Sequence, residues 1–318
     1  MIIEFVVGCG ILAWGADRFI VGSTGIARHF GLSDLLIGVV LIGFGTTFPE
    51  IVVGAIAALH QQPGIAIGNA IGSNITNIAL ILGISVLIAP IAIHSSLVKR
   101  EIPFLLIISL LGSLLVWDGQ LTRFDGLILL ILLVLYLWAI MYFVPRDKDM
   151  KQEITEAQHD KKMTMSMSLF WWFFGLALLF ISSELIVVAA TSFAHWLKVS
   201  DVVIGLTVVA LGTSLPELAA TIISALRGRH DVAIGNIIGS NVFNMLAVLA
   251  TPALIAPTSV SKDFLWRDLP FMLGLSLLLW VLSMCSPNKG KLGRPSGVIF
   301  LLCYFGYIGI VVLSKSSI

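Results

Sequence analysis

The sequence predicts an all-α membrane protein of ten transmembrane helices, arranged as two inverted repeats of five. Three observations indicate this class. Of 318 residues, 58% are hydrophobic and 12% are charged, whereas soluble domains are about 45–50% apolar and ~25% charged. Apolar runs of membrane-spanning length follow one another along the whole chain. Two segments also repeat, without a gap, at a constant offset of 167 residues.

The predicted spans are separated by polar residues, prolines or glycines. Each is near or above the ~20 residues that cross a bilayer as a helix, and none shows the alternating pattern of a transmembrane β-strand. In chain order they lie near 2–28, 34–59, 65–89, 101–117, 124–144, 168–196, 201–226, 232–256, 264–284 and 296–314. The pattern therefore predicts a helical bundle.

One long polar stretch, 145–166, predicts a linker between two halves, 1–144 and 167–318. Lysines and arginines are concentrated in this linker and in the loops on the same side of the bundle. Because cytoplasmic loops carry an excess of Lys and Arg, we expect the linker in the cytoplasm and both termini outside. An even number of spans agrees with termini on one side.

The repeated segments are 33–90 and 200–257. They match at Gly, Pro, Ser, Thr, Asn and Glu positions, which apolar composition alone does not predict. The first copy covers the second and third spans and the second copy the seventh and eighth, so five spans separate equivalent residues. Because five is odd, the copies must cross the membrane in opposite directions. Inverted repeats of this kind are typical of secondary transporters, whose site lies near the midplane.

Each copy carries a glutamate directly after a proline in mid-span, in GFGTTFPE at Glu50 and in ALGTSLPE at Glu217. Proline removes a backbone donor and clashes with the carbonyl four residues back, so we expect each helix to break there. Each glutamate would then lie in the first turn of a half-helix. A mid-span charge costs roughly 2.5–3.5 kcal/mol. Arg18 is the only basic residue well inside a span, so we expect the two carboxylates to face each other and share a cation.

Hydroxyl and amide side chains repeat together with the glutamates. A spacing of four places two side chains on one helix face, and this spacing joins Thr46 to Glu50, Ser73 to Asn77, Thr213 to Glu217, and Ser240 to Asn244. These groups offer oxygen ligands, which suit Ca²⁺ or Na⁺ better than zinc or copper. Asn74 and Asn241 lie off these faces and fit helix packing better. Asp17 and Glu184, also matched by the offset, fit either local pairing or a transport role.

With GTTFPE and GTSLPE, each followed after about 22 residues by GSN-x-x-N, the chain resembles the sodium/calcium exchangers of the calcium/cation antiporter superfamily, in the prokaryotic type with two α-repeats. The resemblance implies that Glu50 and Glu217 are shared Ca²⁺ and Na⁺ ligands. It also implies hydroxyl ligands from Ser73 and Ser240, amide ligands from Asn77 and Asn244, backbone or hydroxyl oxygens from Thr46, Thr47, Thr213 and Ser214, and backbone carbonyls from Gly43 and Ala210. The first and sixth spans would slide to alternate access.

Two positions depart from the family pattern. Asn244 stands where many sodium/calcium exchangers have aspartate, and Thr47 where the family often has serine. Because residue 244 is an amide, only Glu50 and Glu217 supply carboxylates to the centre of the site. One Ca²⁺, two Na⁺ or two protons would neutralise these two charges. A third Na⁺ would leave the site positive. The stoichiometry and the counter-ion therefore stay open at this point.

These features predict a secondary active antiporter that exchanges Ca²⁺ for Na⁺ by alternating access in the plasma membrane, which is the inner membrane in a bacterium. Ca²⁺/H⁺ exchange at the same site is the alternative, and a cation channel is a weaker one. No HExxH or GxSxG motif suggests an enzyme, and a net charge of +1 without a basic face argues against nucleic acid as a partner. The expected partners are membrane lipid and the transported ions, with no cofactor and no obligatory protein partner.

Overall fold

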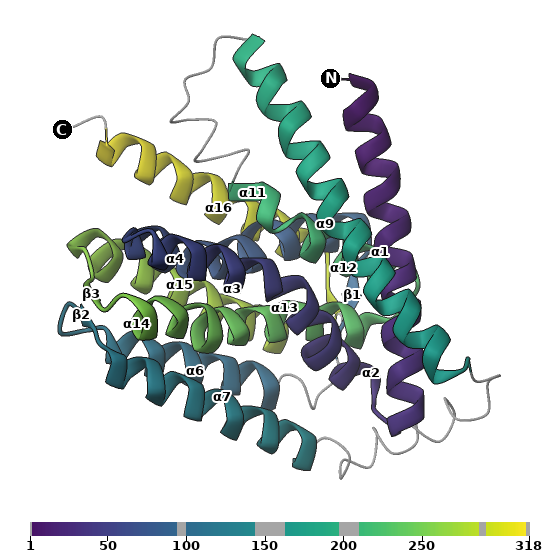
Figure 1. The fold of residues 1–318 in the computed structure, drawn as a ribbon, viewed down its shortest axis with the longest axis horizontal. Coiled ribbons are helices and arrows are strands. Elements are labelled where there is room, and N and C mark those ends of the chain that lie inside the picture. Colours follow the sequence, from purple (N-terminus) through teal and green to yellow (C-terminus); the bar gives the residue numbers. More distant parts are fainter. Residues whose placement is uncertain (1, 94–99, 144–162, 197–209, 286–290, 316–318) are drawn as a thin grey trace. The chain divides into compact units, whose positions relative to one another are not determined.

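The computed structural model describes residues 2–93, 100–143, 163–196, 210–285 and 291–315, and most of them are helical (Figure 1). Among the described residues, eight helices are long and apolar enough to cross a membrane. Two shorter apolar helices, α6 (Ile102–Leu115) and α12 (Leu215–Leu226), fall within the other two predicted spans. The all-α class is confirmed. The count of ten spans and the side of the termini stay predictions.

The helices form two compact units, and each unit combines segments from both halves of the chain. Unit 1 comprises Met1–Thr46 and Tyr136–Gly239, and unit 2 comprises Thr47–Leu135 and Ser240–Ile318. The halves expected at 1–144 and 167–318 are a division of the sequence, and these units cut across it. Most of the predicted linker, like residues 200–209 of the second repeat, lies outside the described residues.

Unit 1 is built around two long helices, α1 (Ile2–Phe30) and α9 (Met165–Trp196). Its other elements are α2 (Asp34–Leu36), the π-helical turn η1 (Ile37–Ile42), the start of α3 (Gly43–Leu59), the end of α7 (Arg123–Phe143), α11 (Ala210–Thr213), α12, and most of α13 (His230–Phe243). Its core is formed by apolar side chains from α1, η1, α9, α12 and α13, among them Phe19, Ile42, Leu179, Ala220 and Val232.

The helices α1 and α9 pack antiparallel, with glycines at the contact (Figure 1). Gly8, Gly15 and Gly22 recur every seven residues along α1, and a Cβ on Gly15 would lie 2.9 Å from Cβ of Leu178. A Cβ on Gly22 would overlap the backbone of Trp172. Small residues let two helix backbones approach closely in this way, so the glycines set the distance between α1 and α9.

A second close backbone approach in unit 1 joins η1 to α13. A Cβ on Gly235 would lie 3.0 Å from the Leu35 carbonyl oxygen, and a Cβ on Gly239 would lie 2.7 Å from Cα of Val39. Gly38 faces the same contact from the other side, against the Val232 carbonyl. Because α3 follows η1 directly, these glycines fix where the first residues of α3 begin.

Unit 2 contains the remaining helices and four short strands. Its helices are most of α3 and α7, α4 (Pro63–Thr76), η2 (Asn77–Leu82), α5 (Gly83–Ile88), α6, the end of α13, η6 (Asn244–Val248), α14 (Ala250–Ile255), η7 (Phe264–Asp268), α15 (Leu269–Met284) and α16 (Arg294–Lys315). Two antiparallel pairs join β1 (Ile91–Ala92) to β4 (Lys291–Leu292), and β2 (Gln120–Leu121) to β3 (Thr258–Ser259).

Contacts in unit 2 follow the symmetry of the sequence repeat. The strands β1 and β3 are related by the 167-residue offset, and each pairs with a strand from the other half of the chain. Arg294 Nε donates to the Leu87 carbonyl at 3.3 Å, and Arg123 Nε donates to the Leu254 carbonyl at 3.2 Å. Leu87 and Leu254 are also equivalent by the offset. The duplication that the sequence contains is therefore matched by equivalent contacts in space.

Candidate cation site

The first Pro-Glu motif lies inside the helix α3, which continues through Pro49 without a break. The prediction of a break is wrong here. The irregular backbone lies upstream, in the π-helical turn η1, and the Thr46 hydroxyl donates to the Ile42 carbonyl at 3.1 Å. Membrane helices tolerate proline where the local helix geometry adjusts around it, and the π-helical turn η1 is such an adjustment upstream of the motif.

The second motif has the predicted break. The helix α11 ends at Thr213, Ser214 has non-helical backbone angles, and α12 begins at Leu215 with Pro216 in its first turn. Glu217 therefore lies in the first turn of a new helix, where the helix dipole favours a carboxylate. The same sequence motif has two different backbones in the two copies.

Two predicted ligands, Asn77 and Asn244, each begin a π-helical turn. The helix α4 changes to η2 at Asn77, and α13 changes to η6 at Asn244. The two positions are equivalent by the offset of the repeat. Single π-helical turns inside α-helices are frequent at functional sites, and both asparagines are buried. Helical periodicity alone gave no signal for these turns.

The predicted ligands are distributed over both units, and nearly all of them are buried. Glu50 and Glu217 are each 1% exposed. Unit 1 contains Gly43, Thr46, Ala210, Thr213, Ser214 and Glu217, and unit 2 contains Thr47, Glu50, Ser73, Asn77, Ser240 and Asn244. Thr213 is half-buried, and only the backbone of Ala210 is described. The residues predicted from the sequence are therefore mostly polar residues that are buried in the folded protein.

The predicted ligands in unit 2 include buried oxygen atoms that have no hydrogen-bond partner among the described residues. They are both carboxylate oxygens of Glu50, the amide oxygens of Asn77 and Asn244, and the Thr47 hydroxyl. Leaving a buried acceptor unsatisfied costs about 1–3 kcal/mol, and more for a charged group. A bound cation could be coordinated by these oxygens and would offset the cost of burying them. A role in helix packing alone would not offset it.

Asn241, which the sequence placed with helix packing, contacts a predicted ligand directly. Asn77 Nδ2 donates to Asn241 Oδ1 at 3.2 Å. The equivalent asparagine of the first copy, Asn74, instead donates to Met272 Sδ at 3.4 Å. The hydrogen bond to Asn241 leaves the amide oxygen of Asn77 available to a cation, so the packing residue and the predicted ligand form one polar cluster.

Sequence reasoning missed two further buried carboxylates, Glu101 and Asp268, which lie at the starts of the predicted spans. They are related by the repeat offset, and each is paired with the arginine before it. Arg100 Nε lies 2.7 Å from Glu101 Oε1, and Arg267 Nε lies 2.7 Å from Asp268 Oδ1. Tyr307 also donates to Asp268 Oδ1 at 2.8 Å. These contacts fit structural ion pairs rather than a transport site.

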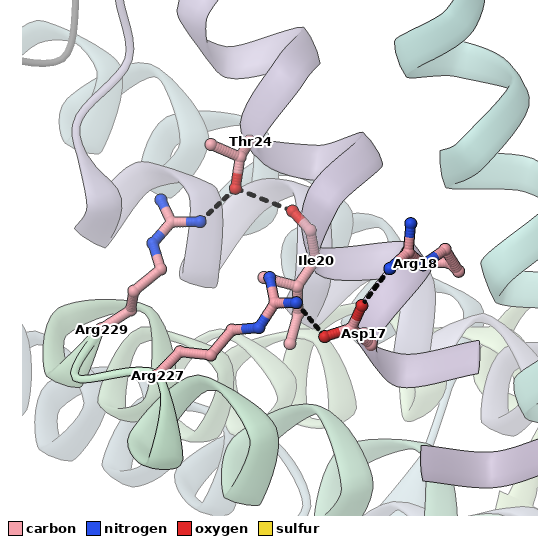
Figure 2. A network of polar contacts seen from close by, with 6 residues as sticks. All are labelled: Asp17, Arg18, Ile20, Thr24, Arg227 and Arg229. Carbon is pink, nitrogen blue, oxygen red and sulfur yellow. Dashed lines mark hydrogen bonds and ion pairs between the residues drawn. The ribbon is translucent and has the colours of Figure 1, made fainter. Parts of the chain in front are cut away.

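A network of ion pairs connects α1 to the turn between α12 and α13, and Figure 2 shows both arginines of the turn reaching toward α1. Asp17 pairs with Arg18 at 2.8 Å and also with Arg227. Arg229 donates to both carboxylate oxygens of Asp34 at 2.9 and 2.5 Å, and to the Thr24 hydroxyl. Local pairing of Asp17 is confirmed. Its repeat equivalent, Glu184, is exposed and has no ion pair among the described residues.

Replacing Arg229 with methionine should lower the thermal stability of the purified protein. The Arg229 side chain is 20% exposed, and its removal takes two hydrogen bonds from the half-buried carboxylate of Asp34. We expect a loss of about 1–3 kcal/mol, below the 3–5 kcal/mol of a fully buried pair. Arg227→Met is the matched control, because Arg227 is 39% exposed and should cost less than about 1 kcal/mol. Equal shifts in melting temperature would contradict this ranking.

A duplicated helical membrane protein with buried acidic and amide side chains at equivalent positions of both copies fits the class of secondary cation transporters. The chain belongs to the sodium/calcium exchanger family. The sequence model of that family, described as sodium/calcium exchanger protein, matches residues 1–142 and 167–313. The chain is therefore a cation antiporter and a multi-pass integral membrane protein.

Individual relatives agree with this assignment. A putative antiporter of Alkalimonas amylolytica, CaxA, is 41% identical over 95% of each chain. The inner membrane protein YrbG of Escherichia coli is 36% identical over 92% of this chain and 91% of its own. The solved structure of the sodium-calcium exchanger NCX_Mj soaked without Na⁺ and Ca²⁺ superposes with a TM-score of 0.80 at 34% identity, over 98% of each chain.

Proposed function

We propose that this protein exchanges Ca²⁺ for Na⁺ across the plasma membrane, the inner membrane in a bacterium, by alternating access. The observation that carries the proposal is the Glu50 carboxylate, buried with both oxygens unsatisfied by the described residues, in the same unit as the unsatisfied amide oxygens of Asn77 and Asn244. This combination of charge and neutral oxygen suits Ca²⁺, which takes 6–8 oxygen ligands at about 2.3–2.6 Å. The relative NCX_Mj is described as a sodium-calcium exchanger, which supports the same ions here.

In the proposed mechanism, Glu50 and Glu217 are the charged ligands of the transported ion. The neutral ligands are the side chains of Ser73, Asn77, Ser240 and Asn244, hydroxyl or backbone oxygens of Thr46, Thr47, Thr213 and Ser214, and the carbonyls of Gly43 and Ala210. Two carboxylates are neutralised by one Ca²⁺ or by two Na⁺. Because either load occupies the same negative charge, the two ions compete, and this competition couples inward Na⁺ movement to Ca²⁺ export.

Access to the site would alternate by movement of α1 and α9. Two features of unit 1 bear on this movement. The two helices contact each other closely through glycines, which would let them move as one pair across the repeat core. The ion pair between Asp17 and Arg227 ties α1 to the α12–α13 turn, so a displacement of α1 would have to break or replace it.

Ca²⁺/H⁺ exchange remains the second candidate, and one observation favours it. A buried carboxylate such as Glu50, with no hydrogen-bond partner among the described residues, can be neutralised by a proton as well as by a metal ion. Two protons would balance one Ca²⁺ in the same way as two Na⁺. The two candidates therefore use one site and differ only in the counter-ion.

The deciding experiment measures ⁴⁵Ca²⁺ flux in proteoliposomes under an imposed Na⁺ gradient, and separately under an imposed pH gradient. We expect uptake that requires internal Na⁺ and ceases when the Na⁺ gradient is collapsed. Flux that follows the pH gradient and ignores Na⁺ would refute Na⁺ coupling in favour of the second candidate. Flux down the Ca²⁺ gradient alone, without any counter-ion, would indicate a channel.

A further inference from the structure

Two asparagines outside the predicted ligand set make the same contact in both copies of the repeat. Asn69 Nδ2 in α4 donates to the backbone carbonyl of Glu50 at 3.3 Å. Asn236 Nδ2 in α13 donates to the backbone carbonyl of Glu217 at 3.3 Å. Both asparagines lie 19 residues after their glutamates, and each contact lies within one unit. The duplication thus provides the same geometry twice, in two copies whose helices differ at the proline.

Asn236 makes two contacts in addition to the one with Glu217. Its Nδ2 also donates to Thr221 Oγ1 at 2.9 Å, and its Oδ1 accepts from Thr46 Oγ1 at 3.3 Å. The side chain is fully buried. It therefore links the acidic residue of the second copy to a hydroxyl of the first copy, using both its donor and its acceptor groups.

We propose that Asn69 and Asn236 are positioning residues of the cation site, which set the orientation of the two glutamate-bearing helices. The inference rests on the proposed function, in which Glu50 and Glu217 bind the transported ion. A hydrogen bond to the backbone carbonyl of a residue fixes the rotation of its helix at that residue. The direction in which the carboxylate leaves the helix is thereby fixed as well.

Asn236 has a second effect, on the Thr46 hydroxyl. A hydroxyl has one hydrogen and two lone pairs. The Thr46 hydroxyl can donate that hydrogen to Asn236 Oδ1 at 3.3 Å, to the Ile42 carbonyl at 3.1 Å or to the Gly43 carbonyl at 3.4 Å, so it acts as a donor toward these three groups. Asn236 therefore favours the orientation in which Thr46 can act as a ligand. Because it supports a charged and a neutral ligand together, Asn236 should matter more than Asn69, which is only half-buried and has one such contact.

The test compares ion affinity with maximal rate in the full-length protein. Groups that orient metal ligands typically change metal affinity by about 10–100-fold when removed. We expect Asn236→Ala to raise the half-saturating Ca²⁺ concentration for exchange by about 10-fold or more, with a smaller change in the rate at saturating Ca²⁺. Asn69→Ala should raise it less, by about 3-fold, because one contact is lost instead of three. Ca²⁺ binding to the purified protein, measured by calorimetry, should weaken in the same order.

Thr221→Val is the matched control. It keeps the volume of the side chain and removes only the hydroxyl that shares Asn236 Nδ2, so the bond from Asn236 to the Glu217 carbonyl is retained. It should lower the melting temperature and leave the half-saturating Ca²⁺ concentration unchanged. An equal loss of affinity in Thr221→Val would show general loosening and overturn the inference. If Asn236→Ala fails to fold, Asn69→Ala carries the same test in the first copy.

Failure of this inference can be told apart from failure of the proposed function. Wild-type flux that ignores the Na⁺ gradient would refute the proposed exchange, whatever the asparagine variants do. A wild-type protein that exchanges ions, together with Ca²⁺ affinities unchanged by both Asn69→Ala and Asn236→Ala, would overturn the positioning role alone. A rise in half-saturating Ca²⁺ in both variants, with Thr221→Val unaffected, supports it.

Discussion

Glu50→Gln and Glu217→Gln should each abolish Ca²⁺ flux. Glutamine keeps the size of the side chain and one oxygen, but it removes a charge that the bound ion needs. Withdrawing one partner from a buried charged pair costs about 3–5 kcal/mol, which corresponds to more than about 100-fold in affinity. Glu50 and Glu217 are each 1% exposed, so bulk solvent is poorly placed to replace the lost carboxylate. We therefore expect flux at the background level of empty vesicles, even at millimolar Ca²⁺.

The measurement is ⁴⁵Ca²⁺ flux under a Na⁺ gradient. Size-exclusion chromatography and thermal unfolding of the purified variants check that each one is folded. Glu50→Gln should fold at least as well as the wild type, because both buried oxygens of the Glu50 carboxylate accept no hydrogen bond from the described residues. Glu217→Gln should also fold, because glutamine keeps the size of the buried side chain. Glu4→Gln is the matched control, since Glu4 is exposed near the start of α1, and it should transport normally. Full flux in either glutamine variant would show that the carboxylate is not a ligand.

Gly22→Ala should destabilise the protein, whereas Gly10→Ala in the same helix should stabilise it. Alanine is favoured over glycine in a helix interior by about 0.5–1 kcal/mol when space allows. A Cβ on Gly10 meets nothing within 4 Å, whereas a Cβ on Gly22 would lie 2.7 Å from Cα of Trp172 and 2.8 Å from the Ser168 carbonyl oxygen. Backbone atoms cannot rotate away, so α1 and α9 must separate. Overpacking of this kind typically costs about 1–3 kcal/mol.

The two glycine variants are compared by melting temperature in detergent and by Na⁺-driven Ca²⁺ flux. We expect shifts of opposite sign in melting temperature and a loss of flux in Gly22→Ala alone. Gly22→Leu should fail to give a folded protein, because a longer side chain faces the same backbone. If Gly22→Ala were as stable as Gly10→Ala, the close approach of α1 and α9 would not determine the stability of unit 1.

The sequence alone determined several features of the site through its internal repeat. Glu50 and Glu217 were singled out because two acidic residues at equivalent mid-span positions are too costly to be accidental, and both are buried. The paired residues Ser73 and Asn77 recur as Ser240 and Asn244, and all four are buried as well. Composition predicted the helical membrane class. The lengths of the apolar runs placed the helices, because the bilayer imposes length and polarity on every span.

Only the tertiary structure decided how each copy of the motif folds. Pro49 lies inside a continuous helix, whereas Pro216 begins a new one. Both copies share the pattern Gly-Thr-x-x-Pro-Glu, so the motif itself does not distinguish them. The two copies therefore reach different backbones in different surroundings: α3 follows the π-helical turn η1 directly, whereas Ser214 interrupts the helix before α12. The π-helical turns that begin at Asn77 and Asn244 were likewise not predicted, because no residue type in these segments is specific for a π-helical turn.

The hydrogen bonds from Asn69 and Asn236 to the glutamate carbonyls also could not be predicted from the sequence. Asn69 and Asn236 matched in the repeat, as did many residues, but their donation to the glutamate carbonyls joins positions 19 residues apart on different helices. A sequence repeat shows which residues are equivalent, because duplication preserves residue types at a fixed offset. It does not show which atoms meet, because hydrogen bonds between helices depend on helix rotation and separation, and contacts from the whole fold set both.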